Sequence, residues 1–202
     1  MLAALSDGDT EIRRFTYGED NVSTLAALRA MGVSVDDDGK GTLKVHGVGL
    51  WGLKAPSAAL DCGNSGTTMR LIAGVLAAQP FASTLVGDAS LSRRPMARIV
   101  NPLRRRGAAI EGAFHPTKAG EVTAPLTIGP LPHGAPLGSS EEVLAVSSAQ
   151  VKSALLLSGL FAEGDTFVSE PLVSRDHTER MLRGLDAPLK VMGTMVSLEV
   201  AN

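Results

Sequence analysis

The order of polar turns and apolar segments repeats along the chain, and this repeat limits the possible fold more than any other feature. A Leu-Arg pair closes a helical run at Leu28, Leu103 and Leu182, with spacings of 75 and 79 residues. Two short β-like segments follow each pair, and a polar turn, a further β-like segment and a small-residue helical run precede it. We therefore expect an α/β (α+β) chain of about three β-α-β-α-β-β units.

The first unit is expected to be shorter than the other two. The tripeptide Gly8-Asp9-Thr10 matches Gly164-Asp165-Thr166 at an offset of 156 residues. On that offset Met1 aligns with Leu157, inside the first helix of the third unit. The first unit should therefore lack the N-terminal part of its helix and the strand before it.

Composition and connecting loops indicate a single domain over residues 1–202 with pseudo-threefold symmetry. The chain is 44% hydrophobic but only 3% aromatic, which predicts an aliphatic core. The Gly/Pro-rich loops at residues 47–58 and 129–140 are too short for flexible interdomain linkers.

The net charge of -2 gives no indication of general nucleic-acid binding. The sequence shows no membrane span or secretory signal, and its one cysteine, Cys62, fits the cytoplasm.

The segment DCGNSGTTMRL, residues 61–71, has the composition of an anion-binding helix start. Asn64 or Ser65 can cap the helix, Gly66 lets a ligand approach the backbone, and Thr67 adds a hydroxyl group. An ordinary capped glycine turn has the same composition, and the segment contains no Walker motif.

Arginines cluster around the next helix. Arg93 and Arg94 precede Pro95, a residue suited to the first helical position. A guanidinium at a helix start opposes the helix dipole, which indicates a bound anion and makes Arg94 a candidate ligand. The three arginines at residues 104–106 suit the helix C-terminus, where we expect a structural role on a solvated face.

Two further polar turns lie at equivalent points of the third unit. Ser147 and Ser148 precede a helix with Gln150 in its first turn, which fits either a capping box or a ligand site. In the Arg-Asp-His sequence at 175–177, Asp176 suits a helix cap. Because no His or Cys residues have metal-ligand spacing, we predict no metal site. Equivalent helix starts of a symmetric domain converge, so we expect them to bind a small phosphorylated anion together.

Four segments resemble the N-terminal-domain signatures of the 5-enolpyruvylshikimate-3-phosphate (EPSP) synthase family, class II in form. They are LDCGNSGTTMRL, GDASLSRRPMARIVNPLRRRGA, SSAQVKSALLLSGL and EPLVSRDHTERML. The resemblance implies transfer of the carboxyvinyl group of phosphoenolpyruvate to the 5-hydroxyl of shikimate 3-phosphate, with release of phosphate. It implies no metal or organic cofactor, and a place in aromatic amino-acid biosynthesis.

The resemblance also assigns substrate-binding positions. For phosphoenolpyruvate they are Gly66, Thr67 and Arg94, and for shikimate 3-phosphate they are Ser148, Ala149, Gln150 and Arg175. Gln150 would touch both substrates and, with Arg94, is the candidate catalytic residue. A glycine at position 66 would leave room for the inhibitor glyphosate.

The sequence departs from the family pattern in two ways. The Lys-Ser motif that precedes the first helix is not present, and neither is the family's second domain with its acid/base groups. We therefore expect a half-enzyme with little turnover alone, which needs a complementary C-terminal domain; the alternative is a non-catalytic binding or assembly module. The related UDP-N-acetylglucosamine enolpyruvyl transferases carry a reactive cysteine before their Arg-Pro pair, a position at which this chain has none.

Overall fold

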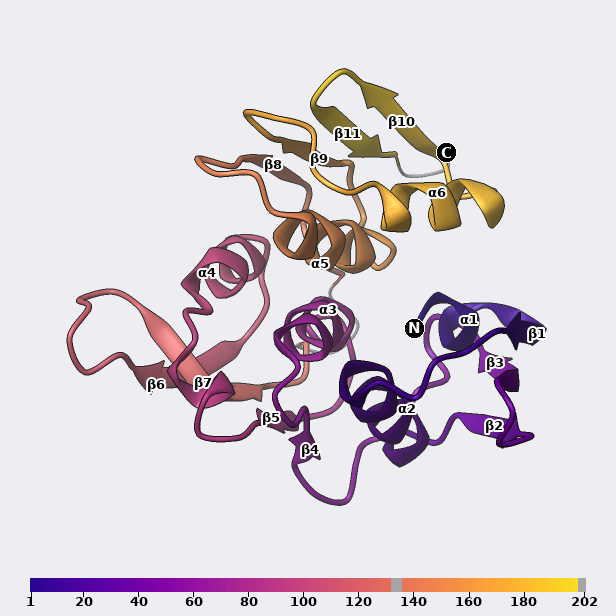
Figure 1. Cartoon of the computed structure of the whole chain (residues 1–202). Helices are drawn as coiled ribbons and strands as arrows, with labels where there is room; N and C mark the ends of the chain where they lie inside the picture. The colour runs from indigo at the N-terminus through magenta and orange to yellow at the C-terminus, as the bar shows by residue number, and fades with distance from the viewer. Residues whose placement is uncertain (132–135, 200–202) are drawn as a thin grey trace.

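The structure is a computed structural model that describes residues 1–131 and 136–199. Figure 1 shows three groups of strands and helices around a centre formed by two helices, α3 (Gly66–Leu76) and α5 (Ala149–Gly159). The predicted α/β class and order of elements are confirmed. Part of the predicted second connecting loop, residues 132–135, lies outside the described residues.

Each unit contains two helices and one sheet. The first unit consists of α1 (Leu2–Leu5), β1 (Asp7–Arg13), α2 (Glu19–Ala30), β2 (Ser34–Asp37) and β3 (Thr42–Val48). The second consists of β4 (Leu60–Asp61), α3, β5 (Ser83–Val86), the short 3-10 helix η1 (Leu91–Arg93), α4 (Ala97–Arg105), β6 (Ile110–Phe114) and β7 (Val122–Ile128). The third consists of β8 (Ser140–Val143), α5, β9 (Thr166–Ser169), α6 (His177–Gly184), β10 (Leu189–Met192) and β11 (Met195–Leu198).

The sheets repeat one strand order. The second and third units have the orders β4-β5-β7-β6 and β8-β9-β11-β10, in which the first two strands are parallel and the other neighbours antiparallel. The first unit has β1-β3-β2, which is the same order without a leading strand in the part of the chain that is described. The internal repeat expected from the sequence is therefore visible in the strand order.

The core lies between the sheets and the central helices α3 and α5. Leu85 of β5 pairs with Leu126 of β7, and both side chains are fully buried. The helices α3 and α5 pack so closely that a Cβ atom on Gly74 would lie 2.3 Å from the backbone oxygen of Ala154. A small residue at position 74 thus sets the distance between the two central helices.

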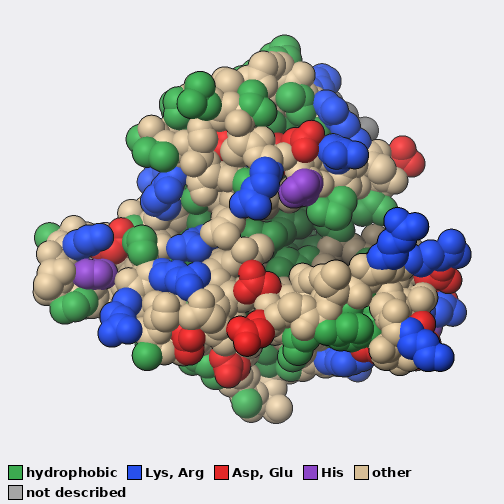
Figure 2. Space-filling model, viewed as in Figure 1, with side chains coloured by type: hydrophobic (Ala, Val, Ile, Leu, Met, Phe, Trp, Pro, Cys, Tyr) green, Lys and Arg blue, Asp and Glu red, His purple; other side chains and the backbone are tan. Residues whose placement is uncertain are grey.

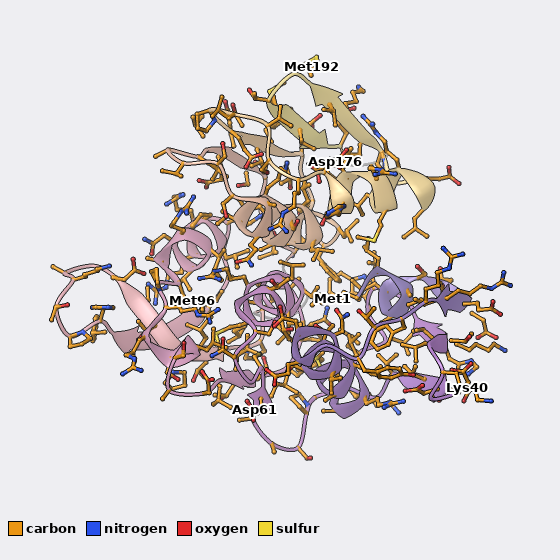
Figure 3. All side chains as sticks on the ribbon, in the orientation of Figure 1. Met1, Lys40, Asp61, Met96, Asp176 and Met192 are labelled. Carbon is orange, nitrogen blue, oxygen red and sulfur yellow. The ribbon has the colours of Figure 1, made fainter. Side chains whose placement is uncertain are left out.

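In Figure 3, two labelled residues that precede helices lie nearer the centre of the molecule than two labelled residues of hairpin turns. Met1 and Met96, which directly precede α1 and α4, lie toward the centre of the molecule. Lys40, between β2 and β3, and Met192, at the end of β10, lie at outer tips.

Two sequence interpretations of helix starts were confirmed and two were wrong, and Asp176 occupies the N-cap position of α6 but makes no side-chain cap bond. Ser65 caps α3 by accepting a hydrogen bond from the Thr68 N–H (3.1 Å), and Ser148 caps α5. The alternative of a capping box from Ser147 is wrong, because its hydroxyl donates to the backbone oxygen of Leu172 (2.6 Å). Pro95 precedes α4 instead of starting it, since the helix begins only at Ala97.

The prediction of a solvated face for the arginines at the C-terminal end of α4 is wrong for Arg106, which is 4% exposed. Its guanidinium donates to the Gly138 backbone oxygen (2.9 Å), the Ser158 hydroxyl (2.8 Å) and the Thr166 hydroxyl (2.9 Å). Burial lowers the pKa of Arg106 to about 10. Arg106 does have the expected structural role, because these hydrogen bonds connect the second unit to the third.

Candidate functional site

The starts of α3, α5 and α6 converge on a pocket of about 190 Å³. Its walls come from the first two turns of these helices and from the loop before α6. The lining residues are Thr67, Leu71, Ala149, Gln150, Ser153, Arg175, His177, Thr178 and Met181. On the face in Figure 2, basic side chains and a histidine border a hollow in the middle of the molecule. We call the space lined by these nine residues the central pocket.

Gln150 lies at the edge of the central pocket and is held at both ends of its amide. Its Nε2 donates to the Thr67 hydroxyl (2.8 Å), and its Oε1 accepts from Nη1 of Arg70 (2.8 Å). The amide carries two N–H groups, so one donor is left after the bond to Thr67. The first turns of α3 and α5 are therefore joined through one glutamine side chain.

On the far side of Gln150, three guanidinium groups form a cluster that we call the arginine cluster: Arg70, Arg94 and Arg98. Burial first, and the nearby charges of Arg94 and Arg98 next, lower the pKa of Arg70. Within residues 1–131 and 136–199, no ion pair includes any of the three. Glu121 and Asp88 are near enough to act electrostatically on Arg70 and Arg94, but neither forms an ion pair with them. Three like charges held together in this way favour an anion in the space beside them.

Arg94 is directed toward Gly66 by its contacts. Its Nη2 donates to Oδ1 of Asn64, whose own amide nitrogen donates to Asp88 (2.7 Å). A Cβ atom on Gly66 would lie 3.1 Å from Nη1 of Arg94 and 2.6 Å from Nη1 of Arg70. The glycine at the start of α3 therefore lies directly against two guanidinium groups.

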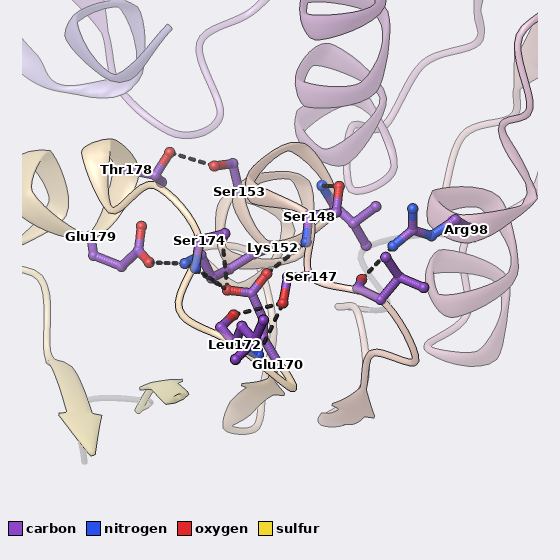
Figure 4. A network of polar contacts seen from close by, with 12 residues as sticks. Arg98, Ser147, Ser148, Lys152, Ser153, Glu170, Leu172, Ser174, Thr178 and Glu179 are labelled. Atoms are coloured by element: carbon purple, nitrogen blue, oxygen red, sulfur yellow. Dashed lines mark hydrogen bonds and ion pairs between the residues drawn. The ribbon is translucent and has the colours of Figure 1, made fainter. Parts of the chain in front are cut away.

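A buried network fixes the start of α5 from behind (Figure 4). Glu170 accepts the Ser148 N–H (2.7 Å) through Oε1, and through Oε2 it accepts the Ser174 hydroxyl (2.7 Å) and pairs with Lys152 (2.9 Å). Lys152 also pairs with Glu179 of α6 (2.6 Å). These contacts connect α5, the loop before α6 and α6 itself, next to the central pocket.

The charges of this network stabilise one another. Burial alone would lower the pKa of Lys152, but its hydrogen bonds with Glu179 and Glu170 raise it. Burial likewise opposes ionisation of Glu170, yet hydrogen bonds from Ser174, Lys152 and the Ser148 N–H lower its pKa. Both groups are thus held charged inside the protein at neutral pH.

The structure brings most of the sequence-predicted site residues together. Four of them, Thr67, Ala149, Gln150 and Arg175, line the central pocket. Gly66 and Arg94 lie on the arginine-cluster side of Gln150, next to Arg70. Ser148 does not line the pocket; it caps α5, and Glu170 accepts its backbone N–H.

Sequence reasoning missed Arg70 and the supporting network. Arg70 lies four residues after Gly66 in α3, and residues at that spacing share one face of a helix. That spacing was a readable signal that Arg70 belongs to the same site as Gly66. Glu170 and Lys152 gave no such signal, because 18 residues separate them and only the fold brings them together.

The site can bind a small anion but contains no obvious group of metal ligands. Among the described residues, no cluster of three or more His, Cys, Asp or Glu side chains could hold a metal ion. No helix in the same part of the chain is long and apolar enough to span a membrane. The available chemistry is hydrogen bonding from an amide, hydroxyl groups and guanidinium groups, which suits phosphate and carboxylate groups.

Known proteins match nearly the whole chain. The family model for EPSP synthase (3-phosphoshikimate 1-carboxyvinyltransferase) matches residues 1–201. Proteins named 3-phosphoshikimate 1-carboxyvinyltransferase from Acidithiobacillus ferrooxidans and Methylococcus capsulatus are 53% and 52% identical over 198 and 199 residues. Each alignment covers 98% of this chain but only 43% or 44% of the relative.

A solved structure agrees with the sequence matches. EPSP synthase from Acinetobacter baumannii superimposes with a TM-score of 0.92 and 47% identity. The match covers 99% of this chain and 43% of that chain. The chain thus spans less than half the length of the relatives it matches. From the family match and these identities, we conclude that the chain belongs to the EPSP synthase family.

Proposed function

We propose that this chain supplies one wall of an active site that transfers the carboxyvinyl group of phosphoenolpyruvate to the 5-hydroxyl of shikimate 3-phosphate. Inorganic phosphate is the second product. The observation that carries the proposal is the position of Gln150, between the central pocket and the arginine cluster. Two anionic substrates that react with each other need two adjacent anion sites, and these are adjacent.

The two sites divide the substrates by chemistry. The central pocket combines hydroxyl groups and apolar side chains with Arg175, which suits a hydroxylated ring that carries one phosphate. The arginine cluster offers Arg94 beside Gly66 and suits the compact, highly charged phosphoenolpyruvate. In this assignment Arg94 and Gln150 contact the reacting groups, and Ala149 and Arg175 hold the acceptor. Ser148 acts by setting the first turn of α5.

Turnover requires groups that this wall does not offer. Among the described residues that line the central pocket there is no carboxylate, and His177 is the one side chain of a type that commonly donates a proton, so we propose that this wall alone does not supply the acid for the enol carbon. We propose that a complementary C-terminal domain closes over the pocket, excludes water and supplies the acid/base groups. We place the reaction in the cytoplasm, where a free thiol such as Cys62 stays reduced.

The test is phosphate release from phosphoenolpyruvate and shikimate 3-phosphate. We expect little release by the 202-residue chain, and release when the remaining part of the Acidithiobacillus ferrooxidans relative is added as a separate polypeptide. Arg94→Ala should abolish that release, whereas Arg105→Ala, whose guanidinium pairs with Glu142 outside the site, should not. Equal release with Arg94→Ala would contradict the assignment.

The second candidate is a non-catalytic binding or assembly module. The observation that favours it is the 43% coverage of the relatives. Such a module would bind shikimate 3-phosphate without phosphate release, even after the complementary polypeptide is added and shown to bind.

A further inference from the structure

We propose that Arg70 is a positioning residue that fixes the amide orientation of Gln150. The inference rests on the proposed function only for the identity of the ligand. Arg70 is placed to connect three helix starts. Its Nη1 donates to Gln150 Oε1 (2.8 Å) and to the Gly66 backbone oxygen (3.3 Å), and its Nη2 donates to the Pro95 backbone oxygen (3.0 Å).

The bond from Arg70 decides which end of the Gln150 amide faces Thr67. A guanidinium has only N–H donors, so it donates to the amide oxygen and cannot bond favourably to the amide NH₂ group, which is also a donor. A flipped amide would place N–H donors against Nη1 of Arg70. With the oxygen held by Arg70, the amide nitrogen lies toward Thr67 and the central pocket, and its second N–H remains available to an anion.

The same geometry makes Gly66→Ala a second probe of the contact between Arg70 and Gln150. A methyl group there would lie 2.6 Å from Nη1 of Arg70, closer than real Cβ contacts come. The nearest atoms are the ends of two flexible side chains, Arg70 and Arg94, and not backbone. Alanine can therefore be accommodated by a shift of Arg70, and that shift breaks its bond to Gln150. We expect the Gly66→Ala variant to fold normally and to lose the hydrogen bond from Arg70 to Gln150, so that the Gln150 amide becomes mobile.

The first test reads the amide directly and needs no ligand. In the ¹⁵N-labelled chain, the side-chain NH₂ signal of Gln150 is assigned as the signal lost in Gln150→Leu. Its heteronuclear NOE should report a rigid group in the unmodified chain and in the control Arg105→Met. It should report a mobile group in both Arg70→Met and Gly66→Ala. A rigid NH₂ group in Arg70→Met would overturn the inference, and so would one in Gly66→Ala.

The second test separates positioning from direct contact with ligand. Shikimate 3-phosphate is titrated by calorimetry into the unmodified chain, Arg70→Met, Gln150→Leu and the double variant. Loss of a hydrogen bond to a charged group corresponds to about tenfold weaker binding for Arg70→Met. If Arg70 acts through Gln150, its replacement causes no further weakening in the Gln150→Leu background. Additive losses would mean that Arg70 contacts the ligand itself, and would overturn the inference.

The outcomes distinguish a failure of this inference from a failure of the proposed function. If the unmodified chain does not bind shikimate 3-phosphate, the ligand assignment is wrong, and the NMR comparison still decides the role of Arg70. If the chain binds the ligand but the amide stays rigid without Arg70, the function stands and the positioning role is wrong.

Discussion

A single buried thiol distinguishes this chain from enzymes that use a cysteine near their substrate. Cys62 is fully buried, and its burial, helped by the charge of Asp61, raises its pKa to about 12. We expect no alkylation of Cys62 by iodoacetamide at pH 7.5 in the folded chain and complete alkylation in urea. Mass spectrometry measures both. Fast alkylation of the folded chain would show that the thiol is accessible, contrary to the structure.

At the same scale, Lys152 holds two buried carboxylates together. Its side chain is 3% exposed, and those of Glu170 and Glu179 are 1% and 4% exposed. Lys152→Met leaves both carboxylates without their cation and should lower the free energy of unfolding by about 3–5 kcal/mol in urea titrations. Lys190→Met removes an exposed ion pair with Glu199 and serves as the control, with an expected loss of about 0–1 kcal/mol. Similar losses for the two variants would contradict the importance of the buried network.

Glu170 gives this network a defined pH dependence. Since its pKa is lowered by folding, its contribution to stability is fully present above its unfolded pKa of about 4.3. The contribution is lost as the pH falls through the lower, folded value. Between pH 5 and pH 3, the unmodified chain should therefore lose more stability than Glu170→Gln does. Parallel losses over that range would show that Glu170 does not titrate in this way.

At the scale of elements, the packing of α3 against α5 depends on Gly74. An added Cβ would lie 2.3 Å from the backbone oxygen of Ala154, which cannot move without shifting α5. Gly74→Ala should destabilise the chain by about 1–3 kcal/mol, the usual cost of overpacking. The matched control is Gly184→Ala in α6, where nothing lies within 4 Å and alanine should stabilise by about 0.5–1 kcal/mol. Thermal unfolding of the two variants should therefore shift in opposite directions.

The elements were predictable where local patterns decide them, and less so where packing does. The repeat predicted the order of helices and strands, and the Ser65 cap was readable from its small polar neighbours. The start of α4 was placed wrongly because Pro95 suits both a turn and a first helical position. The burial of Arg106 was not readable, since its acceptors come from the third unit, far along the chain. Glu170 was missed for the same reason, because its partners are set by the fold, whereas the spacing of Arg70 from Gly66 on one face of α3 could have indicated its place in the site.

For the whole molecule, we propose that the three units form one domain. A continuous group of buried apolar residues includes Ala4 of the first unit, Leu85 of the second and Val168 of the third. Arg106 adds hydrogen bonds from the second unit to the third. Urea unfolding followed by far-UV circular dichroism and by Trp51 fluorescence should therefore give coincident transitions. Separate midpoints for the two signals would show that the units unfold independently.

The central claim is that the starts of α3, α5 and α6 together form a binding wall for shikimate 3-phosphate. NMR titration of the ¹⁵N-labelled chain with shikimate 3-phosphate tests this most directly. We predict that the amide signals that shift most belong to Thr67, Ala149, Gln150 and Arg175. We also predict that Arg175→Met lowers the affinity for shikimate 3-phosphate measured in this titration. No shift at millimolar ligand, or shifts that map to a surface away from these helix starts, would contradict the claim.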